Sequence, residues 1–151
     1  MVLGDEVLAV TVPAFVVPAE AGVQGAPSAG GPAAAAVRDE DSVEVPLLRL
    51  AWGRSGDKGN SSNIGIIARR PEWLPLLREQ LTAARVREWL GHLVEGDVTR
   101  YDLPGIHAMN FLCTRALDGG GMASLRNDPL GKGMGQILLA MPVRVPASWF
   151  A

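Results

Sequence analysis

Apolar residues follow regular spacings only from about Val45 onward. Leu47, Leu48, Leu50 and Trp52 form a short, nearly continuous apolar run, which predicts a buried strand. A polar segment, residues 53–60, follows this run and is expected to form a loop. The isoleucines of the next segment, SNIGIIAR, predict a second strand because β-branched residues suit extended backbone.

The spacing then changes to that of helices. Pro71 is expected to open a helix, since proline is accepted in a first turn, and its apolar side would comprise Trp73, Leu76, Leu77 and Leu81. Thr82 is expected to be the N-cap of a second helix, in which apolar residues recur at helical spacing from Val86 to Val94. Gly96 is a candidate C-cap for that helix.

Three further strands are predicted towards the C-terminus. Val98–Leu103 is half polar and ends at a Pro-Gly turn, whereas Ile106–Leu117 is apolar on both faces and should be a central strand. The segment Gln136–Val145 alternates between apolar and other residues, which favours a strand. A glycine-rich connection, Asp118–Gly135, joins the last two. The order of elements predicts an α+β sandwich, with a mostly antiparallel sheet and two helices on one face.

The first 44 residues differ from the rest and are expected to be an N-terminal extension of the folded domain, residues 45–151. Residues 19–36 are almost entirely Ala, Gly and Pro, a composition typical of a flexible linker. Val7–Val17 is apolar but contains Pro13, so it is either an unstructured tail, which we favour, or a short strand that docks on a sheet edge.

Composition narrows the classes of function. The net charge of −2, with basic and acidic residues interspersed, argues against nucleic-acid binding. No apolar run is long enough to span a membrane, and the acidic N-terminus does not resemble an export signal. The single cysteine, Cys113, suits a reducing compartment, so we expect a cytoplasmic protein. His92 and His107 are too differently placed to form a metal site, and no cofactor is indicated.

The densest polar chemistry lies in the segment RSGDKGNSSN. Two glycines bracket Asp57 and Lys58 and would allow a sharp turn that exposes backbone N–H groups. Such a loop could hold a carboxylate, a phosphate or the phosphates of a coenzyme A ester. Its candidate ligand-binding residues are Arg54, Ser55, Gly56, Gly59, Asn60 and Asn63. The alternative is a tight hairpin in which Asp57 caps its own backbone and Lys58 is solvated. The segment does not match a Walker A loop.

Candidate catalytic residues are His107, Asp57 and Lys58. His107 begins the predicted central strand, and its near-neutral pKa would suit a general base, although a lone histidine on an apolar face is more often a core residue. Its pairing with Asp57 requires the polar loop to fold over the start of that strand. Asn110, on the opposite face of the strand, and Arg126, which could bind a carboxylate in bidentate fashion or simply be solvated, are further ligand-binding candidates.

Four blocks, in order, resemble the AtuA-like domain of acyclic terpene utilisation proteins: LAWGRSGDKGNSSNIGIIAR, PLLREQLTAARVREWL, RYDLPGIHAMNF and SLRNDPLGKGMGQILLAM. The resemblance covers about residues 45–145. It implies a ferredoxin-like α+β fold and a setting in acyl-CoA or isoprenoid-acid metabolism, beside a larger AtuA-type core domain or subunit. It does not imply a defined reaction.

Two functions follow as hypotheses. The first is an accessory or ligand-binding domain that acts with an AtuA-type core protein and contributes one wall of a site for an acyl-CoA or carboxylate ligand. The second is a small lyase or hydratase acting on an acyl-CoA or a branched carboxylic acid, in which the polar loop binds the anion and His107 or Asp57 moves the proton. In either case we expect a homo- or hetero-oligomer.

Overall fold

The structure, a computed structural model, describes residues 41–150. The predicted linker and the apolar segment Val7–Val17 lie outside the described residues. The strands are β1 (Ser42–Pro46), β2 (Ala51–Lys58), β3 (Ser61–Ala68), β4 (Val98–Leu103), β5 (Ala108–Cys113) and β6 (Pro142–Pro146), and the α-helices are α1 (Leu74–Gln80), α2 (Ala83–Trp89) and α3 (Met134–Leu139).

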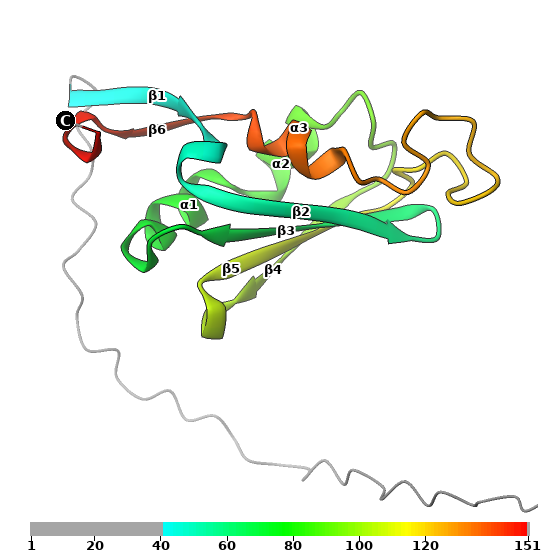
Figure 1. Cartoon of the computed structure of the whole chain (residues 1–151), viewed down its shortest axis with the longest axis horizontal. Helices are drawn as coiled ribbons and strands as arrows, with labels where there is room; N and C mark the ends of the chain where they lie inside the picture. The colour runs from blue at the N-terminus through cyan, green and yellow to red at the C-terminus, as the bar shows by residue number, and fades with distance from the viewer. Residues whose placement is uncertain (1–40, 151) are drawn as a thin grey trace, which may run out of the picture. The chain divides into compact units, whose positions relative to one another are not determined.

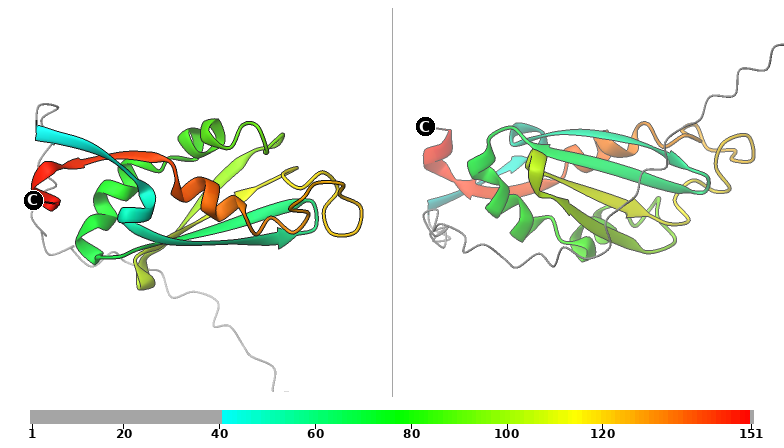
Figure 2. Two further views of the ribbon diagram at one scale, coloured as in Figure 1. Left: turned by 45° about the horizontal axis from the view of Figure 1, so that its top comes forward. Right: turned by 90° about the horizontal axis from the view of Figure 1, so that it is seen from below.

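The central element is a four-stranded sheet in the order β2-β3-β5-β4, in which every neighbouring pair is antiparallel. A separate two-stranded sheet joins β1 to β6. The three helices lie on one side of the four-stranded sheet (Figures 1 and 2). The predicted α+β class, with an antiparallel sheet covered by helices on one face, is therefore confirmed, with β5 in the interior of the sheet as expected.

The hydrophobic core fills the space between the sheet and the helices. Side chains at alternate positions of β3 and β5, such as Ile64, Ile66, Met109 and Phe111, are fully or almost fully buried. Helix α1 contributes leucines from its buried face, as its spacing predicts. The predicted N-cap is also confirmed, because the Thr82 hydroxyl accepts a hydrogen bond of 3.1 Å from the backbone N–H of Arg85.

The first predicted strand is wrong in position. Residues Leu47–Arg49 form a 3-10 turn, in which Leu47 and Leu50 are buried while Leu48 is exposed. Residues three apart share a face in a 3-10 turn, so this apolar run is compatible with a 3-10 turn as well as with a strand. Strand β2 instead begins at Ala51 and continues through most of the predicted polar loop to Lys58. The loop itself is reduced to a two-residue turn.

The predicted strand Gln136–Val145 is wrong in its first half. Helix α3 occupies Met134–Leu139, and only residues 142–146 are extended. Met134 and Leu138 are buried at helical spacing, whereas the alternation that suggested a strand arises because a short apolar run fits both periods. Gly96 is likewise not a C-cap, since α2 ends at Trp89 and irregular turns follow.

The start of the domain also differs from the expectation. Strand β1 begins at Ser42 and pairs with β6 from Ser42↔Pro146 to Pro46↔Pro142. The predicted boundary at Val45 therefore falls inside a paired strand. The strand was missed because its two alternating valines are too few to identify it from the sequence.

Candidate functional site

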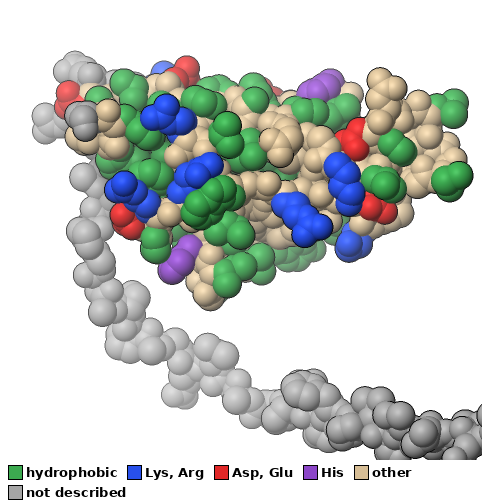
Figure 3. Space-filling view, in the orientation of Figure 1, with side chains coloured by type: hydrophobic (Ala, Val, Ile, Leu, Met, Phe, Trp, Pro, Cys, Tyr) green, Lys and Arg blue, Asp and Glu red, His purple; other side chains and the backbone are tan. Residues whose placement is uncertain are grey.

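A polar cleft of about 390 Å³ lies along β2, the edge strand of the four-stranded sheet. It is lined by residues from β2, β3 and the segment that precedes α3: Arg54, Ser55, Gly56, Asp57, Lys58, Asn63, Gly65 and Lys132. Cationic and acidic side chains are grouped over the part of the surface where the β2–β3 hairpin lies (Figure 3). The chain contains only two lysines, and both line this cleft.

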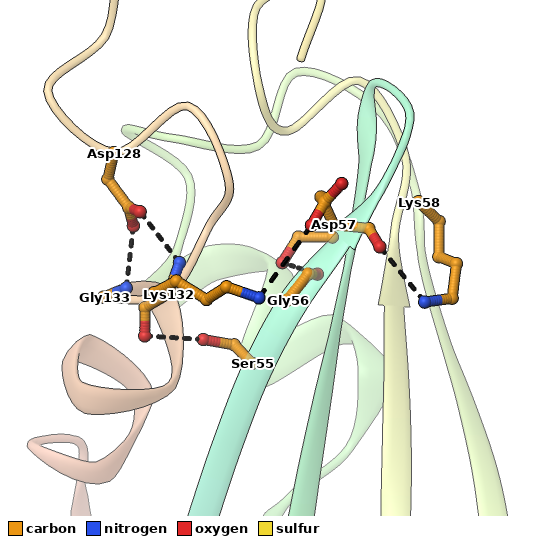
Figure 4. Close-up of polar contacts among 8 residues, drawn as sticks. Ser55, Gly56, Asp57, Lys58, Asp128, Lys132 and Gly133 are labelled. Atoms are coloured by element: carbon orange, nitrogen blue, oxygen red, sulfur yellow. Dashed lines mark hydrogen bonds and ion pairs between the residues drawn. The ribbon is translucent and has the colours of Figure 1, made fainter. Parts of the chain in front are cut away.

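The backbone of Lys132 is held on two sides (Figure 4). The Ser55 hydroxyl donates a hydrogen bond of 3.0 Å to the Lys132 carbonyl and accepts one of 2.8 Å from the Gly135 N–H. The Asp128 carboxylate accepts hydrogen bonds from the N–H groups of Lys132, at 2.8 Å, and of Gly133, at 2.7 Å. These contacts fix the point from which the Lys132 side chain extends towards β2.

Positive charge exceeds negative charge in the cleft. The Lys132 ammonium lies 3.9 Å from Oδ1 of Asp57, and the Lys58 ammonium donates a hydrogen bond of 3.1 Å to the Asp57 carbonyl. The Arg54 side chain makes no hydrogen bond or ion pair with another described residue, so its guanidinium is available to a ligand. Three cations and one carboxylate face a solvent-open hollow, an arrangement that favours anions.

Close packing, rather than a sharp turn, explains the glycine at position 56. A Cβ atom on Gly56 would lie 3.3 Å from the Lys132 ammonium, so a larger side chain would push that group out of the cleft. The turn is made by Gly59, at a φ of 62°, together with Asn60. Asn60 supports the structure: its side-chain oxygen accepts hydrogen bonds from the N–H groups of Leu117 and Gly119. Neither Gly59 nor Asn60 lines the cleft.

Two of the three asparagines predicted to bind ligand, Asn63 and Asn110, are neighbours. Asn63 lines the cleft, and its Nδ2 donates a hydrogen bond of 3.4 Å to Oδ1 of Asn110 on the adjacent strand β5. Both side chains lie on the sheet face opposite the core, as the alternation of β5 predicts for Asn110. Asn110 therefore adjoins the cleft through Asn63.

His107 lies at the other end of the sheet. Its carbonyl accepts a hydrogen bond from the N–H of Ala68, whereas Asp57 pairs with Ser62. The six residue-to-residue steps from Ser62 to Ala68 separate the two ends by about 20 Å at the usual rise of a strand. The condition for pairing Asp57 with His107, that the polar segment folds over the start of the histidine strand, is not met, because this segment is itself a strand that runs away from His107.

The imidazole also stands outside the core. His107 is exposed, precedes β5 and has a left-handed backbone conformation with a φ of 52°. The structure therefore places it neither with the buried residues of β5 nor in the cleft with Asp57 and Lys58.

Arg126 also lies apart from the cleft. Its Nη1 donates hydrogen bonds to the carbonyls of Leu93, at 3.0 Å, and Ala116, at 2.6 Å, so it is not the freely solvated side chain of the alternative interpretation. It lines a second cavity. Lys132, in turn, was not identified from the sequence as a residue of the site, because it lies between two glycines of the connection Asp118–Gly135, in which only Arg126 was a candidate.

Other chemistry is limited in the described part of the chain. Cys113 is buried, and burial raises the pKa of its thiol from 9.0 to about 11, partly offset by the nearby Arg87 guanidinium. Residues 41–150 contain no group of three His, Cys, Asp or Glu side chains that could hold a metal ion. They also contain no helix that is both long and apolar enough to cross a membrane.

Comparison with known families agrees with the ordered sequence blocks. The profile of the AtuA ferredoxin-like domain family matches residues 45–144, which is most of the described structure. Neither the curated proteins nor the solved structures gave a match. The match extends from the end of β1 to β6 and includes every residue that lines the polar cleft. The chain belongs to the AtuA ferredoxin-like domain family.

Proposed function

We propose that this chain is an accessory ligand-binding domain, which acts with an AtuA-type core protein in acyl-CoA or isoprenoid-acid metabolism. The observation that carries the proposal is the polar cleft, where Arg54, Lys58 and Lys132 surround a hollow beside a single carboxylate. In this function the cleft holds the anionic part of the ligand, such as the phosphates of a coenzyme A ester.

The form of the cleft supports a shared site. The Lys132 side chain is 60% exposed, and the cleft opens along an edge strand, so a bound ligand would be covered by this domain on one side only. A partner surface could supply the second wall, exclude water and strengthen the charge-assisted hydrogen bonds. An AtuA-type core protein is the partner that family membership suggests.

The alternative function, a small lyase or hydratase, has less support from the geometry. It requires a proton-transfer group beside the bound anion. Asp57 is at the cleft, but His107 is at the opposite end of the sheet. Binding groups are therefore better represented in the cleft than acid–base groups, which favours the accessory function.

Coenzyme A is a suitable first probe of the cleft. Reductive methylation with ¹³C labels the two lysines and keeps their charge, so that NMR signals from both ammonium groups can be followed during a titration. We expect both signals to shift and the affinity to fall as salt is added. Arg54→Gln and Lys132→Gln should each weaken binding by at least about fivefold, since hydrogen bonds to charged groups contribute about 1.5–3 kcal/mol.

Arg49→Gln is the matched control. Arg49 is an exposed cation that lies over the ring of Phe150 and does not line the cleft. Equal weakening by Arg49→Gln and Lys132→Gln would mean that coenzyme A responds only to overall charge, and lysine signals that do not move would refute the site.

The partner is tested separately with the AtuA-type core protein of the same source. We expect the purified proteins to form a complex by size-exclusion chromatography, and coenzyme A to bind the complex more tightly than the isolated domain. Failure of the two proteins to associate at micromolar concentrations would refute the accessory function while leaving the anion-binding cleft standing.

A further inference from the structure

A second cavity, of about 330 Å³, lies between the helices and the loop that follows β5. Its walls are largely apolar, with polar groups from the 126–128 loop and His92 from the turn after α2. The residues that line it are His92, Leu93, Ala116, Leu117, Arg126, Asn127, Asp128, Met134 and Ile137. None of them lines the polar cleft described above. Its size is at the lower end of the range typical of small-molecule sites.

The walls of the second cavity are fixed by hydrogen bonds between its elements. The Trp89 indole N–H donates a hydrogen bond of 2.8 Å to the carbonyl of Ile137, which ties α2 to α3. Arg126 joins the turn after α2 to the loop that follows β5 through the carbonyls of Leu93 and Ala116. The cavity is therefore held open by the fold itself, as expected of a preformed binding site.

Arg126 retains donors for a ligand. Both of its side-chain hydrogen bonds use Nη1, which leaves Nη2 and Nε without a partner among the described residues. The Asp128 carboxylate, by contrast, is occupied by the backbone N–H groups of Lys132 and Gly133. The charged side chain with free donors in the cavity is thus the Arg126 guanidinium, which binds carboxylates well because its donors match the two oxygens.

We propose that this second cavity is a binding site for a small carboxylate with a compact hydrocarbon body. The hydrocarbon contacts Leu93, Met134 and Ile137, and the carboxylate accepts hydrogen bonds from Nη2 and Nε of Arg126. The proposal goes beyond the proposed function and does not depend on it, because the two sites have no lining residue in common.

Cyclohexanecarboxylate is a probe of this chemistry, and cyclohexylmethanol is its neutral counterpart. The full chain contains five methionines, so ¹³C-methyl labelling of methionine gives a small set of NMR signals. We expect the acid to shift the signal of Met134, in the cavity wall, and to leave that of the fully exposed Met122 unchanged. The acid should bind at least about fivefold more tightly than the alcohol.

Two variants test the walls and the charge. Ile137→Phe adds bulk to a half-buried position of the cavity wall and should weaken binding of the acid by at least about fivefold. Arg126→Lys keeps the positive charge but loses the planar fork, and should bring the affinity for the acid close to that for the alcohol. If either variant fails to fold, the Met134 shift in the unmodified chain still decides the proposal.

Lys132→Gln distinguishes the two sites. It should weaken coenzyme A at the polar cleft and leave cyclohexanecarboxylate binding unchanged. Binding of the acid that is lost in Lys132→Gln but kept in Ile137→Phe would overturn the second site without affecting the proposed function. A Met134 signal that does not move at millimolar acid would also overturn it.

Discussion

Ser55→Ala should disrupt the Ser55 joint, by which we mean the two hydrogen bonds that connect Ser55 of the edge strand β2 to Lys132 and Gly135. Ser55 is 5% exposed, and its hydroxyl makes two hydrogen bonds, one to the carbonyl of Lys132 and one from the N–H of Gly135. Gly135 approaches β2 so closely that a Cβ atom on it would lie 3.1 Å from the Ser55 hydroxyl oxygen. Without the hydroxyl there is too little space for water to replace it directly.

The expected loss in the free energy of unfolding follows from the hydrogen-bonding groups that Ser55→Ala leaves unpaired. The buried Gly135 N–H would lose its partner, at a cost of about 1–3 kcal/mol, and loss of the second hydrogen bond adds about 0.5–1.5 kcal/mol. We therefore expect the free energy of unfolding to fall by about 2–4 kcal/mol. For a domain of this size the midpoint of thermal unfolding should fall by about 10 °C.

Ser62→Ala is a matched control for this measurement. Ser62 is fully buried on the adjacent strand, but its hydroxyl makes only one hydrogen bond, of 3.1 Å, to the carbonyl of Gly56. Its loss should reduce the free energy of unfolding by about 1 kcal/mol. Chemical denaturation of the unmodified protein, Ser55→Ala and Ser62→Ala, followed by tryptophan fluorescence, compares their free energies of unfolding.

Ser55→Ala should also weaken ligand binding. Because the Lys132 backbone loses one of its two anchors, we expect coenzyme A to bind Ser55→Ala more weakly even at temperatures where the variant is folded. A loss of stability no greater than that of Ser62→Ala would refute the two-bond joint. Unchanged coenzyme A affinity in a destabilised Ser55→Ala protein would show that Lys132 does not depend on this anchor.

Two further predictions concern other parts of the domain. Because the pKa of the Cys113 thiol is raised, it should react with a thiol reagent only on unfolding. The unfolded thiol ionises at a lower pH than the folded one, so the neutral thiol's contribution of about 2–3 kcal/mol to the free energy of unfolding is present below pH 9 and lost towards pH 11. Denaturation measured as a function of pH tests this. His107→Gly should leave coenzyme A affinity unchanged and alter the free energy of unfolding by less than about 1 kcal/mol, since the left-handed backbone suits glycine; a large loss of affinity on titration would contradict the separation of the two ends.

The fold class was predictable because it depends on local periodicity. The isoleucines of β3, such as Ile64 and Ile66, and the apolar run that includes Met109 and Phe111 of β5 identified two strands, and the side chains at alternate positions on their inward faces are buried. The helical spacing around Leu77 and the cap at Thr82 were also read correctly. In each case one side chain in every two, or in every three to four, meets the core, and this is the signal that a single sequence carries most clearly.

Short elements were not predictable for the same reason. Helix α3 spans six residues, too few to separate a period of 3.6 from a period of 2 in an apolar run. The glycines of β2 were misleading, because a glycine can indicate either a turn or a close approach of the backbone to another element. In β2 it mainly indicates a close approach, since a Cβ atom on Gly53 would lie within 3.1 Å of Leu139 on α3. Only the tertiary contact separates the two meanings.

The composition of the candidate site depended on strand direction, which residue types do not reveal. The polar segment and the histidine were both correctly chosen as chemically notable, but an antiparallel ladder places residues near one another by register: Asp57 faces Ser62, and Ser62 faces Cys113, at the far end of β5 from His107. Lys132, 75 positions after Asp57, reaches the cleft because Ser55 and Asp128 fix its backbone. Each of those contacts is long-range or belongs to an irregular loop, so the cleft exists only once the sheet and α3 have packed together. The proposed anion binding therefore depends on tertiary structure, and substitution of Ser55 should weaken it as strongly as substitutions of the lysines.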